Sequence, residues 1–402
     1  MMIWTRFSPG RHDRESESLL SAQAKLPSCI SPPARAAWWA DAPRLAARSS
    51  RARGEIKRAS YRLGAAMLEV ESTYQPLLDD LHHAYGDCAV AASAGDLVPR
   101  VRCFANLIQE QSLLVLRFSA PEGLPHLCDV AMCLTRPRAE LQHYSIRELD
   151  QPGWRLIANA LDESAPLLAA GENFALLDVR VQPPELLLNL VVGLAQLVQQ
   201  SVIFIHAGGV SINGQGTLLI GRSGRGKSTT SVALASRGHG LLGDETVGIR
   251  ADSCEIVAFR RTLKLRPGPG TRAIAERLSA VPHTLRSDAN GVMCAWVGAG
   301  ALFPGSTPVL SAPLRNAFFL RDFRAQPVIE SFIPDLARLE ELRALTMSLS
   351  AVVSWPVSPA RRLMRFAQVI DLLARCRCHF LDLGSPDETA ALIERTVLNH
   401  AA

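Results

Sequence analysis

A glycine-rich segment near the middle of this 402-residue chain constrains its fold more than any other feature. Gly221–Ser228 reads Gly-Arg-Ser-Gly-Arg-Gly-Lys-Ser and satisfies the pattern G-x-x-x-x-G-K-[ST] at every required position. The apolar run Thr217–Ile220 before it is typical of a strand, and Thr229–Ser236 after it is typical of a helix. Strand, loop and helix in this order predict an α/β domain whose loop binds phosphate groups.

Each residue type in the loop has a physical reason. The glycines let the backbone turn tightly and bring N–H groups close to phosphate oxygens. Lys227 supplies an ammonium for the β- and γ-phosphates, and the Ser228 hydroxyl coordinates Mg²⁺. The dipole of the following helix favours the same anion. We therefore expect ATP and Mg²⁺ to bind here, with ATP or GTP left open because the loop contacts phosphates and not bases. The predicted binding residues are Gly221, Arg222, Ser223, Gly224, Arg225, Gly226, Lys227, Ser228 and Thr229.

Two acidic residues follow the loop closely. Asp244 comes just 17 residues after Lys227 and Glu245 follows it directly, a gap that holds one helix, a turn and an adjacent strand. Both carboxylates are therefore expected beside the phosphates, where alternation along the strand aims one of them at the metal. Ser228, Asp244 and Glu245 are the predicted metal ligands. An ordinary strand-end carboxylate is the alternative for Asp244, and alternation can turn Glu245 away from the site.

The stretch His206–Ile249 resembles the catalytic core of HPr kinase/phosphorylase and its relatives. The shared parts, in order, are His206-Ala207-Gly208-Gly209-Val210, a hairpin at Asn213-Gly214, the phosphate loop, Arg237-Gly238-His239 and Asp244-Glu245-Thr246-Val247. The resemblance implies an α/β P-loop kinase domain of the HPr kinase and phosphoenolpyruvate carboxykinase type. The overall layout is similar to the HPr-kinase-related proteins of peptide-modifying gene clusters, including the closing segment Cys378–Glu388.

The resemblance also implies roles for individual residues. Asp244 would take the proton from a substrate hydroxyl or from water, Glu245 would lie near the metal, and His206 would lie near the catalytic acid. A buried histidine bonded to a carbonyl is the equal alternative for His206. The chain lacks the glycine-rich downstream signature of HPr kinases, for which 265–270 is a loose echo, so phosphorylase activity and HPr itself as substrate are not expected.

Lysine usage adds Lys227 and Lys264 to the candidate catalytic residues. The chain has 43 basic residues, of which only four are lysines. Because arginine is its usual basic residue, a lysine inside the globular part is unusual. Lys264 lies between Leu263 and Leu265, which suggests a strand, and we expect it to contact a phosphate or the substrate. A solvated strand residue is the alternative.

Composition changes along the chain predict three parts. Residues 1–58 form an Arg-, Ser- and Pro-rich extension expected to be flexible, 59–182 a smaller α/β or β-rich domain, and 183–402 the P-loop kinase-like domain. Asn213-Gly214 between two apolar runs predicts a hairpin. Asn316–Leu320 and Pro327–Ser331 are predicted to be paired strands. Helices are predicted at Leu77–Tyr85, Glu185–Gln200, Asp335–Ser348, Pro359–Ala374 and Pro386–Leu398.

The charge distribution and the apolar runs bear on partners and location. The net charge of +5 arises in the first 60 residues, which carry a surplus of six, so the remainder has a net charge of about −1 and no basic domain for nucleic acid. The apolar run Leu186–Val198 is too short and polar for a membrane span. A cytoplasmic protein is expected, with a homo-oligomer left open.

These features together predict a serine kinase. It would transfer the γ-phosphoryl group of ATP to a serine hydroxyl of a peptide or small protein. Two alternatives remain open from the residues. One is a nucleotide-binding regulatory module without phosphotransfer, suggested by Glu245 in place of a second Asp and by the missing signature. The other is a small-molecule kinase, because no motif identifies the acceptor.

Overall fold

The computed structural model describes most of the chain from residue 54 onward. The described residues are Arg44, Arg48, 54–91, 100–108, 113–119, 144–148, 155–159, 162–170, 174–178, 184–197, 199, 201–222, 224–287, 291–304, 306, 309–334 and 359–399. The predicted helix at 335–348, the bulk of the predicted extension 1–58 and Ser223 of the phosphate loop lie outside them.

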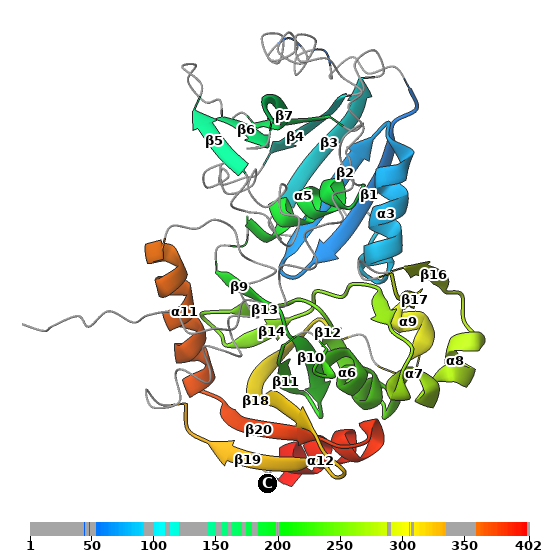
Figure 1. Ribbon diagram of the computed structural model, residues 1–402, viewed down its shortest axis with the longest axis vertical. Coiled ribbons are helices and arrows are strands. Elements are labelled where there is room, and N and C mark those ends of the chain that lie inside the picture. The colour runs from blue at the N-terminus through cyan, green and yellow to red at the C-terminus, as the bar shows by residue number, and fades with distance from the viewer. Residues whose placement is uncertain are drawn as a thin grey trace, which may run out of the picture.

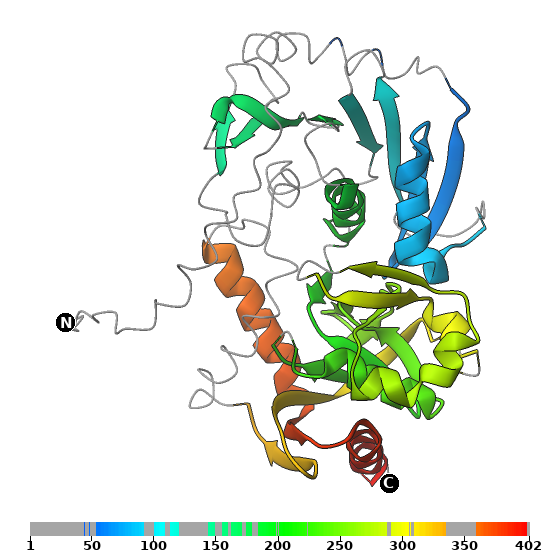
Figure 2. The ribbon, with the colours of Figure 1, turned by 45° about the vertical axis from the view of Figure 1, so that its right-hand side comes forward.

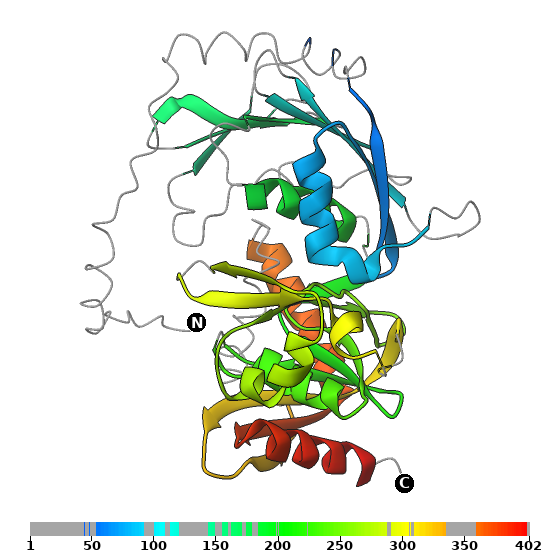
Figure 3. The same cartoon turned by 90° about the vertical axis from the view of Figure 1, so that its right-hand side faces the viewer.

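The first part of the chain forms an eight-stranded sheet with two helices on one side. The strand order is β1-β2-β3-β4-β8-β7-β6-β5. The strands are β1 (Lys57–Leu63), β2 (Ala66–Ser72), β3 (Arg100–Ile108), β4 (Leu113–Ser119), β5 (Tyr144–Glu148), β6 (Arg155–Asn159), β7 (Asp162–Ala170) and β8 (Phe174–Asp178). The helices α3 (Gln75–Tyr85) and α5 (Pro184–Leu197) lie on the side of this sheet that faces the second domain (Figure 3). This is the β-rich α/β layout that the sequence predicts.

Helix α5 shares the core of this first sheet. Leu187, Val191 and Leu194 are buried together with Leu68 of β2 and Val101 of β3. Leucine and valine at helical spacing give α5 one apolar face, and the nearest apolar surface is the first sheet. The predicted kinase-like range 183–402 begins with α5, although this helix packs on the first sheet. The strands of the second domain begin only after it, at Val202. The two domains lie one above the other with α5 between them (Figure 2).

The second domain contains a branched nine-stranded sheet. One path runs β12-β10-β11-β18-β14-β13-β9, and β20 pairs with both β18 and β19. The strands are β9 (Val202–Ile205), β10 (Gly208–Ile212), β11 (Gln215–Ile220), β12 (Gly240–Gly243), β13 (Val247–Arg250), β14 (Glu255–Val257), β18 (Ser311–Phe323), β19 (Val328–Phe332) and β20 (Arg377–Leu383). Helices α6 (Lys227–Ser236) and α12 (Pro386–Asn399) cover one face, and α11 (Pro359–Ala374) covers the other (Figure 1).

The hairpin predicted from Asn213-Gly214 is confirmed. Strands β10 and β11 pair antiparallel from Gly208↔Leu219 to Ile212↔Gln215. Asn213 has a φ of 49° and Gly214 a φ of 77°. Positive φ at both central residues is the type I′ geometry that Asn-Gly favours, so the local sequence determines this turn.

The prediction that β18 and β19 pair with each other is wrong. Both strands pair with β20, parallel from β18 and antiparallel from β19. Six of the seven residues of β20 are buried, whereas no residue of β19 is fully buried. A strand that is apolar on both faces takes the central position, which leaves β19 at the edge.

A small third sheet joins the two domains. It consists of β15 (Leu263–Leu265), β17 (Met293–Val297) and β16 (Thr284–Ser287), with the short helices α7 (Pro269–Ala273), α8 (Ala275–Ser279) and α9 (Ala299–Leu302) beside it. The segment leading into β15 is bonded to the first domain, because the Thr262 N–H donates to the Ala84 carbonyl at 2.7 Å and the Gly64 N–H donates to the Ala258 carbonyl at 3.0 Å. No helix in the described part of the chain is both long and apolar enough to span a bilayer.

Candidate nucleotide site

The phosphate loop has the backbone that its sequence predicts. It leaves β11 at Ile220 and enters α6 at Lys227. Gly224 has a φ of 80° and Gly226 a φ of 79°, in the left-handed region that residues with a side chain rarely adopt. Gly226 is also the N-cap of α6. The glycines at these two positions are therefore required by the conformation of the loop, which curls around the start of the helix.

Lys227 lies buried inside this loop. Its Nζ donates to the carbonyl oxygens of Gly221 at 2.7 Å and Arg222 at 3.2 Å. Burial lowers the pKa of the ammonium, while the nearby carboxylates of Asp244 and Glu245 act in the opposite direction. The ammonium is thus held within the loop by carbonyl groups, next to two carboxylates and beside the helix N-terminus. That is where a phosphate anion is favoured.

Asp244 lies in the turn after β12, beside Ser228. Its carboxyl group is buried, and its Oδ1 has no hydrogen-bond partner. Burial raises the pKa of this carboxyl to about 6, and the carboxylate of Glu245 adds to the rise, whereas a hydrogen bond with Ser228 and the charge of Lys227 oppose it. A buried carboxylate with an unpaired oxygen costs free energy, and binding of a proton or a cation to that oxygen would lower this cost.

Glu245 and His206 are connected through the backbone. The Nδ1 of His206 lies 2.7 Å from the carbonyl oxygen of Glu245, so the ring nitrogen donates to this oxygen. The Glu245 carboxylate accepts from Arg261 at 3.1 Å. The structure therefore bonds His206 to a main-chain carbonyl of the acidic pair, with the imidazole half-buried. Its role in catalysis stays a prediction. His206 holds the turn that carries Asp244 and Glu245.

Lys264 lies on β15 in a cation–π contact. Its Nζ is 5.5 Å from the ring centroid of Trp296, and the guanidinium of Arg261 lies 5.7 Å from the same ring. After β15, the short helix α7 approaches α6 so closely that a side chain at Gly270 would overlap Thr229. The structure places Lys264 on the small sheet that flanks the phosphate-loop helix. Its contact with phosphate or substrate stays a prediction.

The predicted magnesium ligands suit a metal that arrives with the nucleotide. The described residues contain no group of three or more His, Cys, Asp or Glu side chains able to hold a metal ion by themselves. Magnesium in such sites keeps several waters and binds through one or two carboxylates together with substrate phosphates. The hydroxyl of Ser228 and the unpaired Oδ1 of Asp244 fit this donor set, and Glu245 lies next in the chain.

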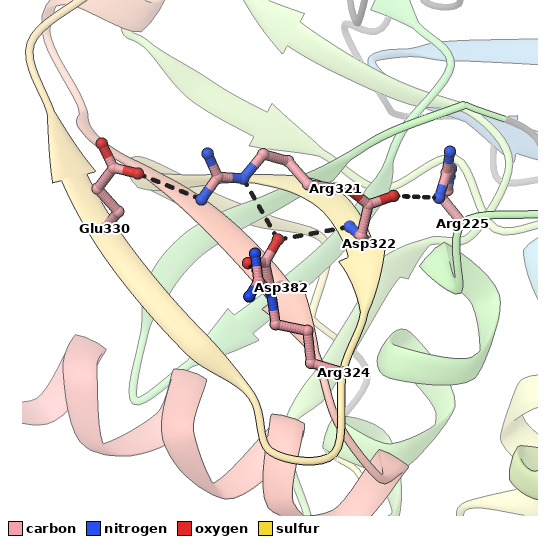
Figure 4. Close-up of polar contacts among 6 residues, drawn as sticks. All are labelled: Arg225, Arg321, Asp322, Arg324, Glu330 and Asp382. Carbon is pink, nitrogen blue, oxygen red and sulfur yellow. Dashed lines mark hydrogen bonds and ion pairs between the residues drawn. The ribbon is translucent and has the colours of Figure 1, made fainter.

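A second group of charged residues lies on the opposite side of the loop, and the sequence analysis named only its member Arg225, as a nucleotide-binding residue. Arg225 of the loop donates to Asp322 at 2.8 Å. Asp382 is buried, with its Oδ1 3.4 Å from Arg321 Nε and its Oδ2 2.5 Å from Arg324 Nε (Figure 4). These residues come from β11–α6, β18 and β20. No local signal identifies the contacts among them, because Arg225 and Asp322 are 97 residues apart and meet through strand pairing alone.

No family model matches the chain. The HPr kinase/phosphorylase of Chlorobium chlorochromatii is 34% identical over 88 residues, which are 22% of this chain and 22% of that protein. The HPr kinase/phosphorylase of Caldanaerobacter subterraneus subsp. tengcongensis is 50% identical over 48 residues, 12% of this chain and 16% of that protein. The solved HPr(Ser) kinase/phosphatase from Coxiella burnetii aligns at 16% identity with a TM-score of 0.26, covering 50% of this chain and 96% of that chain.

Over these aligned stretches the chain is similar to proteins named HPr kinase/phosphorylase. The resemblance drawn from its motifs is thus confirmed as a partial similarity to this family. The chain spans only about a fifth of the length of these curated relatives.

Proposed function

We propose that this protein is an ATP- and magnesium-dependent kinase that transfers the γ-phosphoryl group to a serine hydroxyl of a peptide or small protein. One observation carries the proposal. A buried carboxyl group with an unpaired oxygen, Asp244, lies beside the first helical turn of a glycine-rich phosphate loop. A structural carboxylate would have a cation or N–H groups around both oxygens. The free oxygen of Asp244 is available to a substrate proton or a metal.

Two groups of residues act on the γ-phosphate. One group binds the phosphates of ATP, and the other faces the attacking serine hydroxyl. Lys227 and the backbone N–H groups of the loop hold the β- and γ-phosphates and neutralise their charge. Asp244 accepts the proton of the attacking serine hydroxyl. A pKa near 6 leaves Asp244 mostly ionised at neutral pH and yet basic enough to take a proton as the hydroxyl oxygen attacks phosphorus. The P–O bond to ADP breaks as the new one forms.

Magnesium, when bound with ATP, would supply positive charge to the phosphate oxygens. Ser228, Asp244 and Glu245 are the residues that would hold it. His206 fixes the turn that carries both carboxylates through its hydrogen bond to the Glu245 carbonyl. Arg261 holds the Glu245 side chain. Because Arg261 belongs to the segment bonded to the first domain, that domain contributes to the position of the acidic pair.

A peptide or small-protein acceptor is the substrate class we propose. Its support is the similarity to proteins named HPr kinase/phosphorylase, a name that gives HPr as their acceptor. The resemblance of the sequence layout to the HPr-kinase-related proteins of peptide-modifying gene clusters adds to it. We further propose that the enzyme works in the cytoplasm, where ATP and reduced cysteines are found. The described cysteines, such as Cys88 and Cys378, are free.

The test is phosphotransfer from γ-labelled ATP to the peptide encoded beside this protein's own gene. Labelled peptide is expected with magnesium, and Lys227→Ala is expected to abolish both labelling and nucleotide binding. Asp244→Asn is expected to keep nucleotide binding and lose labelling. Tight ATP binding without any labelled product, in the presence of that peptide, would contradict the kinase and support a nucleotide-dependent regulatory module.

A further inference from the structure

An exposed aromatic ring lies directly against the phosphate loop. Phe323, at the end of β18, is 61% exposed. Its Cζ is 3.5 Å from the point where a side chain at Gly226 would begin, and Leu383 of β20 lies 3.6 Å from that point. The ring therefore packs one edge against the start of α6 and leaves most of its surface open. An exposed ring beside an anion site suits a ligand in which an apolar ring system is joined to a phosphate group.

A bulge in β18 turns this ring toward the loop. The register runs from Leu320↔Leu381 to Phe323↔Leu383, so three residues along β18 match two along β20. Without the extra residue, Phe323 would continue the alternation of Arg321, whose guanidinium lies over Phe380 on the opposite face of the sheet. One inserted residue reverses the direction of the side chain. Phe323 consequently shares the face of Leu383 and α6.

The residues on both sides of Phe323 are held in place. Arg321 and Arg324 both contact the buried carboxylate of Asp382, and the Arg324 N–H donates to the Leu383 carbonyl at 2.7 Å. Asp322 accepts from Arg225 of the loop (Figure 4). Four polar contacts thus fix a four-residue segment whose single apolar side chain stays exposed. The arrangement keeps the ring in place without covering it.

The position of the ring matches the course of a nucleotide. Asp244 follows β12, which lies on one side of β11, and β18 lies on the other side. With the γ-phosphate toward Asp244 and the β-phosphate at Lys227, the α-phosphate and the nucleoside extend away from β12, toward β18. Aromatic side chains stack on nucleobases, and such stacking is independent of which base is present.

We propose that Phe323 is the stacking platform for the nucleobase of the bound nucleoside triphosphate, an inference that rests on the proposed nucleotide binding. The platform consists of Phe323, with Leu383 beside it and Arg225–Asp322 joining it to the loop. A ring face does not distinguish adenine from guanine, so the platform contributes affinity for the nucleobase whichever base is present. Other contacts determine whether ATP or GTP is preferred.

Binding of ATP and of inorganic tripolyphosphate to the same variants tests this. Phe323→Leu keeps an apolar side chain without a ring, and it is expected to weaken ATP binding about tenfold while leaving tripolyphosphate binding unchanged. Phe323→Tyr is expected to restore ATP affinity. Ile333→Ala is the matched control, because Ile333 is equally apolar and 81% exposed but follows β19 at the opposite end of the sheet.

The outcomes separate this inference from the proposed function. If Phe323→Leu weakens ATP and tripolyphosphate equally, the ring only supports the loop and the platform is wrong. An unchanged ATP affinity in Phe323→Leu also overturns it. Lys227→Ala is expected to lose both ligands. Should Lys227→Ala retain both, the nucleotide site itself is misplaced and the proposed function fails, whatever Phe323 does.

Discussion

Two buried aspartates flank the phosphate loop, and their surroundings differ in kind. Asp382, at the end of β20, has an arginine against each of its oxygens. Asp244, after β12, has one oxygen without any hydrogen-bond partner, and burial raises its pKa to about 6. Both side chains are less than a tenth exposed. The difference indicates that burial alone does not mark a functional carboxylate, whereas burial without compensation does.

The contrast extends to the neighbours of each aspartate. On the side of Asp382 the charges are paired and the aromatic ring of Phe323 is exposed. On the side of Asp244 the carboxylates are crowded together near one buried lysine. We therefore assign scaffolding to the first side and proton transfer and metal binding to the second, and the following variants test that division.

Asp244→Asn has the largest expected effect. Phosphotransfer should fall on the order of a thousandfold, because an amide cannot accept the proton of the serine hydroxyl. Initial rates with labelled ATP measure it. Ser236→Ala, at the C-terminal end of α6 away from the loop, is a control expected to keep its rate. Full activity in Asp244→Asn would transfer the role of base to another residue.

The same variant should also stabilise the protein. The folded state holds the Asp244 proton up to about pH 6, whereas the unfolded state releases it near the ordinary value of 3.8, so stability is lost as pH rises between these values. Replacing the carboxylate removes a cost of about 1–3 kcal/mol at neutral pH. Urea unfolding at pH 7.5 and at pH 4 measures it, and the gain should be smaller at pH 4. A variant less stable than the parent at pH 7.5 would show that the carboxylate is compensated.

The pH dependence of phosphotransfer is the next effect in size. The ionised form of Asp244 is the active one, so the rate should fall below a pH of about 6, by about tenfold for each further unit. The dependence of kcat/KM for ATP on pH between 5 and 8.5 tests this, because this ratio reports the pKa values of the free enzyme, and circular dichroism at each pH confirms that the protein stays folded. A rate that is constant down to pH 5 would exclude Asp244 as the base.

Asp382→Asn should change stability in the opposite sense to Asp244→Asn. It leaves Arg321 and Arg324 without their shared carboxylate, and we expect a loss of about 1–2 kcal/mol, below the usual cost for a buried pair because Arg324 is 60% exposed. Urea unfolding of the two variants under identical conditions compares them. If both variants shift stability in the same direction, the division between the two sides of the loop is wrong.

The Arg225–Asp322 pair has the smallest expected effect. Both side chains are exposed, at 40% and 68%, so the ion pair should contribute less than about 1 kcal/mol to folding. A double-mutant cycle of Arg225→Met and Asp322→Asn measures the coupling, and its size should decrease in 0.5 M salt. A coupling above about 2 kcal/mol would mean that the pair is a main support of the loop.

Local sequence was sufficient for the loop and the turn beside it. Gly224 and Gly226 adopt left-handed backbone, and Asn213-Gly214 forms the expected hairpin, because each depends on the conformational freedom of individual residues. The spacing between Lys227 and Asp244 was also informative, since a helix and one strand can span it in few ways. Strand pairing was less accessible. The sequence did not indicate that β20 lies between β18 and β19.

What the sequence determined by itself is the chemistry of a phosphate loop, because adjacent residues carry it and backbone geometry permits it. What only tertiary structure decided is the electrostatic state of the charged groups around the loop. Asp244 and Asp382 both come after apolar residues, Asp244 directly after β12 and Asp382 near the end of β20, and they look alike in the sequence. Their difference comes from arginines and from burial contributed by strands far apart in the chain, and these come together only when the sheet has formed.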